Sequence, residues 1–241
     1  MQPDLSELPL VGGHPALDLV NTLERGVPLG GEPPYDYLTD TSALLRWTVR
    51  VGLISDAEAT RVGRAWRADT ATAQAGLAAV RDIREELHPA LLATIPPERG
   101  NANSPGRAES IAAGAALVEL HGRWSAATAR AALVLDKGEP PKVRLAYGTV
   151  PAMLIPDRMA EATVDVLLTA DLTRVRRCPV DEGGCGWLFL DQSRNGSRRW
   201  CRMADCGSTA KARRLTERRR ADRRKGPAAG SGGQSPQRGQ S

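Results

Sequence analysis

The chain has 241 residues, of which 41% are hydrophobic and 25% are charged. A chain of this length and composition can bury a core, which excludes a wholly disordered protein. Aromatic residues make up only 4%, so the core must consist mainly of alanine and aliphatic side chains. Such a composition favours helices over sheets.

The net charge of +5 hides an asymmetry along the chain. Residues 198–225 contain twelve Lys or Arg and three acids, a net +9, and the remainder contains 21 basic and 25 acidic residues, a net −4. The basic end predicts an anionic partner. No stretch reaches the roughly 18 apolar residues of a membrane helix, and the start, MQPDLSELPLVGG, does not resemble a signal peptide. We therefore expect a cytoplasmic protein with no membrane partner.

A first short helix is predicted over residues 13–24, GHPALDLVNTLE, where apolar residues gather on one side. Asp18 and Asn21 lie three positions apart on this helix and therefore share a face. Two interpretations of this polar pair stay open, one as a structural network or cap and the other as a ligand contact.

Capping signals predict the starts of the next two helices. Asp40 can cap a helix over 41–51, and the pattern S-x-x-E formed by Ser55 and Glu58 is a capping box that opens a helix running toward Arg67. Long helices are predicted over 70–94 and 108–121.

The periodicity then changes from helical to alternating. Residues 129–136 and 142–148 flank a Gly-Pro turn and predict a β-hairpin. Residues 157–172 return to a helical pattern. After about Lys225 the chain has no apolar residues beyond small ones, and we expect a disordered tail.

All four cysteines fall within 29 residues, in the pattern C-x6-C-x15-C-x4-C. Because cytoplasmic thiols stay reduced, such a cluster predicts a metal site rather than disulfides. Four thiolates close the tetrahedral shell of Zn²⁺, which is typical of a structural site and not of a catalytic one. The alternative is four buried, reduced cysteines without a metal. The predicted ligands are Cys178, Cys185, Cys201 and Cys206.

The spacer between the inner cysteines predicts a strand over GWLFLD, a turn at QSRNGS and a return strand at RRW. Trp187, Phe189 and Trp200 are expected to form an apolar cover over the metal. A helix capped by Ser208 or Thr209 should follow Cys206. This order of knuckle, hairpin, knuckle and helix is similar to a treble-clef finger.

The fold class predicted from these elements is mainly α. A helical N-terminal domain with a β-hairpin is expected over residues 1–172, a small zinc finger with a basic helix over 173–222, and a disordered basic tail over 223–241.

The basic residues around the finger are mostly arginine, the side chain that favours bidentate contacts with phosphate and guanine. A solvated helix face is the alternative explanation for this charge. The predicted nucleic-acid contacts are Arg198, Arg199, Lys211, Arg213, Arg214 and Arg218.

Two stretches resemble known bacterial families. CGWLFLDQSRNGSRRWCRMADCG followed by AKARR resembles the CGNR zinc-finger proteins, and GGHPALDLVNTL resembles the start of the ABATE domain that precedes that finger. The resemblance implies a helical domain, a zinc finger held by the four cysteines, and a DNA-binding, stress-linked transcription regulator. The chain departs from the family at Ser208 and Thr209, which replace the Asn and Arg of the CGNR motif, and its first knuckle is longer than the family pattern.

Duplex DNA is thus the expected partner, and RNA or the ribosome is the alternative. A homodimer and a small-molecule effector of the helical domain are left open. The histidines at 14, 88 and 121 lie on separate predicted elements, and no catalytic motif appears in the sequence. We therefore expect a protein that is not an enzyme.

Overall fold

The computed structural model describes residues 5–25, 35–95, 107–136 and 138–225. The helices of the N-terminal part are α1 (Pro15–Val20), α2 (Thr41–Arg50), α3 (Asp56–Ala68), α4 (Thr70–Leu92), α5 (Arg107–Ala129) and α6 (Leu154–Thr169), with a hairpin of β1 (Ala132–Asp136) and β2 (Lys142–Ala146) between the last two. The C-terminal part contains β3 (Val175–Arg177), β4 (Leu188–Leu190), a π-helical turn (Met203–Gly207) and α7 (Ser208–Lys225).

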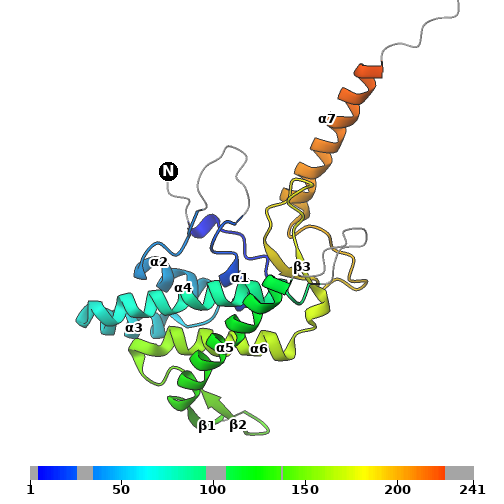
Figure 1. The fold of residues 1–241 in the computed structure, drawn as a ribbon. Coiled ribbons are helices and arrows are strands. Elements are labelled where there is room, and N and C mark those ends of the chain that lie inside the picture. The colour runs from blue at the N-terminus through cyan, green and yellow to red at the C-terminus, as the bar shows by residue number, and fades with distance from the viewer. Residues whose placement is uncertain (1–4, 26–34, 96–106, 137, 226–241) are drawn as a thin grey trace, which may run out of the picture.

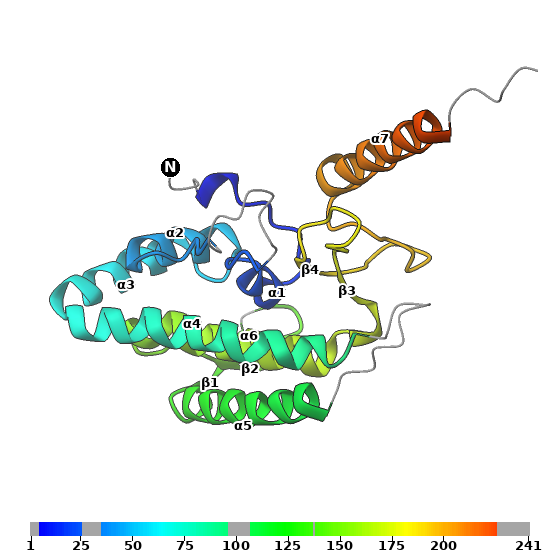
Figure 2. The same ribbon diagram turned by 45° about the horizontal axis from the view of Figure 1, so that its top comes forward.

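Helix α4 lies at the centre of the helical body and packs against α1, α2, α3, α5 and α6. Figures 1 and 2 place α2 and α3 toward one end of α4, and Figure 2 shows α4, α5 and α6 running side by side. The core consists mainly of aliphatic side chains, as the composition predicts, together with the fully buried Trp47. The mainly helical fold with two small antiparallel hairpins is confirmed.

Local capping explains where several helices begin. The carboxylate of Asp40 accepts a hydrogen bond from Ala43 N at 2.8 Å, which starts α2. Ser55 and Glu58 form the predicted capping box, in which Ser55 N donates to the Glu58 carboxylate at 2.9 Å. Both cap predictions are confirmed.

Some boundaries differ from those expected. Helix α1 is shorter than the predicted 13–24, because His14 caps its N-terminus and Asn21 its C-terminus. Helix α5 continues through Ala129, well past residue 121. The hairpin forms as predicted, with Leu133 opposite Leu145.

In both views α7 projects away from the helical body (Figures 1 and 2). It runs to Lys225, three residues into the segment expected to be a disordered tail, and the rest of that predicted tail, 226–241, lies outside the described residues. Among the described helices, none is long and apolar enough to cross a membrane.

Candidate metal centre

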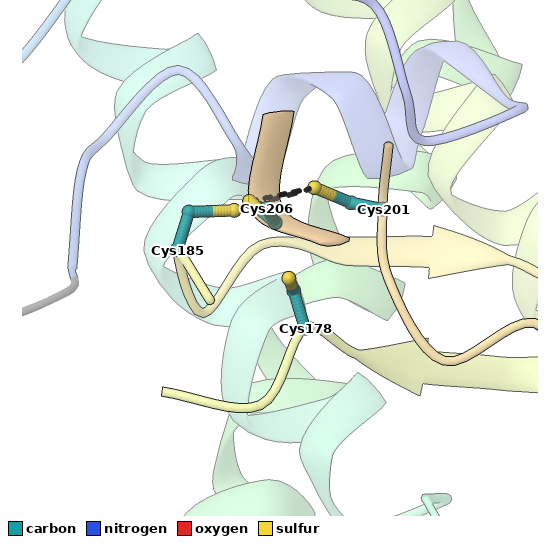
Figure 3. Close-up of side chains that lie close together, drawn as sticks. All are labelled: Cys178, Cys185, Cys201 and Cys206. Atoms are coloured by element: carbon teal, nitrogen blue, oxygen red, sulfur yellow. Dashed lines mark hydrogen bonds between the residues drawn. The ribbon is translucent and has the colours of Figure 1, made fainter. Parts of the chain in front are cut away.

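The four cysteines come together from four separate parts of the finger (Figure 3). Cys178 directly follows β3, Cys185 lies in the loop before β4, Cys201 lies in the long loop after β4, and Cys206 lies in the π-helical turn that leads into α7. Cys178 and Cys201 are buried, and the other two are partly buried. Four residues from a stretch of 29 residues thus converge in one compact site.

The spacing of the sulfur atoms fits a tetrahedral metal ion. All four Sγ atoms lie within 4.8 Å of one another. The Sγ of Cys201 is 3.4 Å from that of Cys185 and 3.6 Å from that of Cys206. A Zn–S bond of about 2.3 Å in a tetrahedron places neighbouring sulfurs about 3.8 Å apart. The donor set, four thiols and no oxygen, also suits zinc better than the hard cations.

Glycines let the backbone of the first knuckle close around Cys178. Cys178 O accepts a hydrogen bond from Gly186 N at 3.1 Å, and Gly184 N donates to Pro179 O at 2.7 Å. A Cβ at Gly184 would lie 2.7 Å from the Cys178 sulfur, and Gly186 has a φ of +79°. Side chains at these two positions would therefore crowd or strain the knuckle.

The cysteines influence one another's protonation strongly. Hydrogen bonds from the thiols of Cys185 and Cys201 lower the pKa of Cys178 to about 2. The proximity of Cys178 raises the pKa of both Cys185 and Cys201 above the usual range of a thiol. Without a cation, then, Cys178 is the favoured thiolate and its neighbours stay protonated, and a bound cation would favour the thiolate form of all four by balancing their charge.

An apolar shell surrounds the sulfurs, as predicted. Val11 and Phe189 are buried together with Cys178 and Cys201, and Trp187 and Trp200 pack against this cluster. Trp187 contacts the core of the helical body as well. The finger is therefore continuous with the rest of the hydrophobic interior.

The predicted strand pairing inside the finger is wrong. Strand β4 pairs with β3, with Val175 opposite Leu190, and residues 198–200 form no strand. The buried carboxylate of Asp191 explains this, because it accepts hydrogen bonds from Ser193 N at 2.9 Å and Arg198 N at 2.8 Å. These bonds hold the 191–198 loop in a compact form, so residues 198–200 do not return alongside β4 as a strand.

The start of the last helix also differs from the prediction. Ser208 has helical backbone angles, with a φ of −67° and a ψ of −43°, and its hydroxyl donates to Met203 O. The Thr209 hydroxyl donates to Asp205 O. Neither residue is an N-cap, because the π-helical turn that contains Cys206 continues directly into α7.

The predicted nucleic-acid contacts fall into groups with different surroundings. The Arg198 guanidinium lies 4.6 Å from the centre of the Phe189 ring and donates to Trp200 O at 3.0 Å. It also donates to Cys201 O. Arg198 therefore supports the second knuckle from inside the finger.

The partly buried Glu182 is a residue that the sequence analysis missed. Its carboxylate forms ion pairs with both Arg199 and Arg214. It thereby ties the first knuckle to the second and to α7. Its position in the glycine-rich DEGG stretch gives no sign of this role, because both partners are distant in the sequence.

Helix α7 carries the other predicted contacts, and all of them are exposed. Arg213 pairs with Glu217 at 3.0 Å, four residues along the helix. Among the side chains described, which on α7 end at Arg220, Lys211 and Arg218 have no ion-pair partner. They line a groove of about 380 Å³ that also contains Trp200 and Met203.

Asp18 and Asn21 are both buried, but they have separate partners. The Asp18 carboxylate accepts a hydrogen bond from Gly12 N at 2.8 Å, and burial raises the pKa of that carboxyl to about 6. The Asn21 amide bonds both backbone groups of Leu188, donating to its O at 2.8 Å and accepting from its N at 2.9 Å. Both side chains therefore bond to backbone groups of the protein itself.

The same N-terminal segment also contacts the finger. Leu190 N donates to Gly12 O at 2.9 Å, and Val11 is part of the apolar shell around the cysteines. The segment from Val11 to Asn21 therefore belongs to the helical body and the finger at once.

Comparison with known families agrees with this arrangement. A CGNR zinc-finger model matches residues 174–219, and the ABATE model, described as "Putative stress-induced transcription regulator", matches residues 13–170. A search of curated proteins found no match. The ABATE match covers well over half of the chain and the finger match follows it directly, so the chain belongs to the ABATE family and carries a C-terminal CGNR zinc finger.

Proposed function

We propose that this protein is a zinc-dependent, DNA-binding transcription regulator. In this proposal Cys178, Cys185, Cys201 and Cys206 hold one Zn²⁺, which keeps the finger folded and has no catalytic part. Helix α7 contacts duplex DNA, and the helical body senses a signal or forms a dimer. The cytoplasmic location expected from the sequence belongs to the same proposal.

The observation that carries the proposal is the exposure and charge of α7. Its sequence from Ser208 to Lys225 contains nine basic residues and two acids, a net charge of +7. The helix has 18 residues, so it is about 27 Å long at a rise of 1.5 Å per residue. A free helix of this size and charge fits the major groove of B-DNA, which is about 12 Å wide.

The departure from the CGNR motif limits which residues can read bases. The hydroxyls of Ser208 and Thr209 are directed to the carbonyl oxygens of Met203 and Asp205. Sequence specificity, in this proposal, comes from residues further along α7, such as Lys211 and Arg218.

The test is selection of duplex fragments by the full-length, zinc-loaded protein at physiological salt, followed by titration of an enriched duplex. An enriched motif is the expected result. In the titration, the pair Lys211→Ala and Arg218→Ala should weaken binding at least about tenfold, because two phosphate or base contacts are lost.

The matched control is the pair Arg64→Ala and Arg67→Ala, two exposed arginines on α3. It removes the same charge and should leave the affinity nearly unchanged. Equal loss in both pairs would overturn the assignment of α7 as the binding surface.

One observation favours single-stranded RNA as a second candidate partner. The groove beside α7 has an apolar floor and a basic rim, an arrangement that suits unpaired bases stacked on apolar side chains with phosphates held at the edge. Trp200, Met203 and Leu215 form the floor, and Lys211, Arg214 and Arg218 form the rim.

The two candidates differ in their response to the floor of this groove. Replacement of Met203 and Leu215, both exposed, by alanine should weaken RNA binding several-fold if bases stack there. Duplex binding through the arginines should be nearly unaffected. Tighter binding of duplex DNA than of RNA at equal salt, with no effect of these substitutions, would reject the RNA candidate.

A further inference from the structure

The β1–β2 hairpin presents an apolar face to solvent. Leu133 lies opposite Leu145 and Leu135 lies opposite Val143 in the register of the two strands. Because side chains alternate along a strand, all four lie on one face of the ribbon. Their exposed fractions are 74% for Leu133, 64% for Leu135, 67% for Val143 and 41% for Leu145.

The alternation is inverted relative to an ordinary surface hairpin. Val134, on the opposite face, is the half-buried residue of β1. That same face carries the ion pair between Asp136 and Arg144, at 3.0 Å. The apolar residues thus point outward and the charges lie on the other side, where a surface sheet normally has the reverse pattern.

Among the described elements, each strand of the hairpin packs extensively only against the other strand. A two-stranded ribbon alone is marginally stable in water, and its outer edges are open to pairing. An exposed apolar face on such a ribbon is typical of an interaction surface.

Helix α5, which ends at Ala129 just before β1, also exposes apolar side chains. It packs against α4 and α6, and apolar residues lie on its exposed side as well. Ile111 and Val118 on it are exposed by 63% and 68%. A Cβ at Gly114 would meet no atom of the described part of the chain within 4 Å, so those residues leave this side of the helix open.

We propose that the outer face of the hairpin, together with the exposed side of α5, is the surface through which two copies of this chain form a dimer. The four aliphatic residues are placed as two facing pairs, so the patch is complementary to itself when a copy is rotated about a two-fold axis. The four hairpin side chains carry no charge that would demand an acidic or basic partner. Two such sheets stack face to face at about 10 Å.

The size that a dimer interface needs explains why α5 is part of the proposed surface. A stable dimer buries about 800 Å² per partner, from roughly 20–30 residues. The hairpin has five residues in each strand, which is too few alone, and the exposed side of α5 supplies the remainder. Obligate homodimer interfaces are also the more apolar class.

The test uses the full-length, zinc-loaded protein without nucleic acid, so that its outcome is independent of DNA binding. Sedimentation velocity over micromolar concentrations should find a dimer. The double variant Leu133→Lys with Leu135→Lys should raise the dimer dissociation constant at least about tenfold, since it places like charges across the two-fold axis. Because both residues are exposed, the helical circular dichroism and the melting temperature of the monomer should be retained.

The matched control is Leu168→Lys on α6, where the leucine is exposed by 78%. This variant should dimerise like the parent. Hydrogen exchange gives an independent readout, since the amides of residues 132–136 and 142–146 should exchange more slowly in the dimer. A chain that stays monomeric throughout, or a dimer that the double lysine variant does not weaken, would overturn the proposal.

Discussion

Asp18 couples proton binding to the stability of the fold. Its carboxylate is buried at the start of α1 and accepts from Gly12 N. Burial raises its pKa to about 6, against 3.8 for the ordinary group, although hydrogen bonds from Gly12 and Val11 oppose the rise. The folded state therefore binds this proton more tightly than the unfolded state.

This shift predicts the pH response of Asp18→Asn. As pH rises from about 4 to 6, the unfolded state releases the proton first, so the Asp18 carboxyl makes the wild-type protein less stable across that window. The asparagine variant has no such titration, and its Oδ1 can still accept from Gly12 N. Between pH 4 and pH 7, the free energy of unfolding of the variant minus that of the wild type should therefore increase by up to about 3 kcal/mol.

Urea unfolding at a series of pH values measures this difference. Asp181→Asn, which removes an exposed carboxyl in the first knuckle, controls for the change of charge. A constant difference between Asp18→Asn and wild type from pH 4 to pH 7 would show that Asp18 does not titrate in the folded state as described.

The buried Cys178 should be the least replaceable of the four cysteines. In Cys178→Ser the serine hydroxyl is a poor zinc ligand, and only three cysteine ligands remain to hold the ion. We expect the bound zinc to fall from one ion per chain to nearly none. Residues 174–207 should lose their protection from hydrogen exchange, while α4 and α6 stay protected by their own packing.

Metal analysis of the purified protein and residue-level hydrogen exchange provide the measurements. Ser197→Ala, an exposed change in the same finger, should keep its zinc. Full zinc retention in Cys178→Ser would mean that the ion is not held by these four sulfurs.

Single-residue roles were predictable where a local spacing carries them. The cysteines and the aromatic cover over them follow from their positions in the sequence. Glu182, whose two arginine partners are 17 and 32 positions away, and Asn21, whose partner Leu188 is 167 positions away, could not be assigned in this way. Their roles arise only when the chain is folded.

At the scale of elements, α1 is joined to β4 by one side chain. The Asn21 amide satisfies both Leu188 N and Leu188 O inside the protein. Asn21→Ala would leave this buried N–H and C=O without partners, at a cost of about 1–3 kcal/mol each. We expect the free energy of unfolding to fall by about 2–4 kcal/mol, with faster hydrogen exchange in β3 and β4.

Chemical denaturation at neutral pH measures the loss. Asn195→Ala, an exposed asparagine of the loop after β4, should change stability by less than about 0.5 kcal/mol. Comparable effects of the two substitutions would mean that the Asn21 bonds do not hold the finger to the body.

The elements themselves differ in how far sequence predicts them. Starts of helices with a capping residue, such as Asp40 and Ser55, follow from four or five neighbouring residues. The pairing of β4 with β3 does not, because it depends on the hydrogen bonds of the knuckle and on the buried Asp191. The pattern around residues 198–200 satisfies a strand locally, and the tertiary bonds override it.

For the whole molecule, the concentration of positive charge in the C-terminal part predicts how strongly DNA binding depends on salt. The logarithm of the binding constant falls with the logarithm of salt concentration by about 0.9 for each phosphate neutralised. Replacement of Arg218, Arg219 and Arg220 by alanine should therefore lower the slope by up to about 3. Titrations of one duplex at several salt concentrations measure this slope.

The control for this prediction removes three exposed arginines from α3, at positions 61, 64 and 67. It changes the net charge equally, and its slope should match that of the wild type. A reduced slope in the control would mean that the overall charge, rather than contacts along α7, governs binding.

The hairpin of the proposed dimer lies well away from α7 in both views of the molecule (Figures 1 and 2). Two copies joined through their hairpins would therefore keep both basic helices free. Such a dimer could contact two sites on one duplex, and the distance between half-sites would then follow from the dimer geometry.

The segment from Val11 to Asn21 gives the helical body a share in the energetics of metal binding. Because these residues bond to β4 of the finger and also belong to the core of the body, an ion that binds only the folded finger stabilises the body by mass action. The melting temperature of the helical body should therefore rise as the concentration of free zinc rises. By reciprocity, a molecule that binds the body and shifts α1 will change the zinc affinity of the finger. The factor equals the one by which zinc changes the affinity of the body for that molecule.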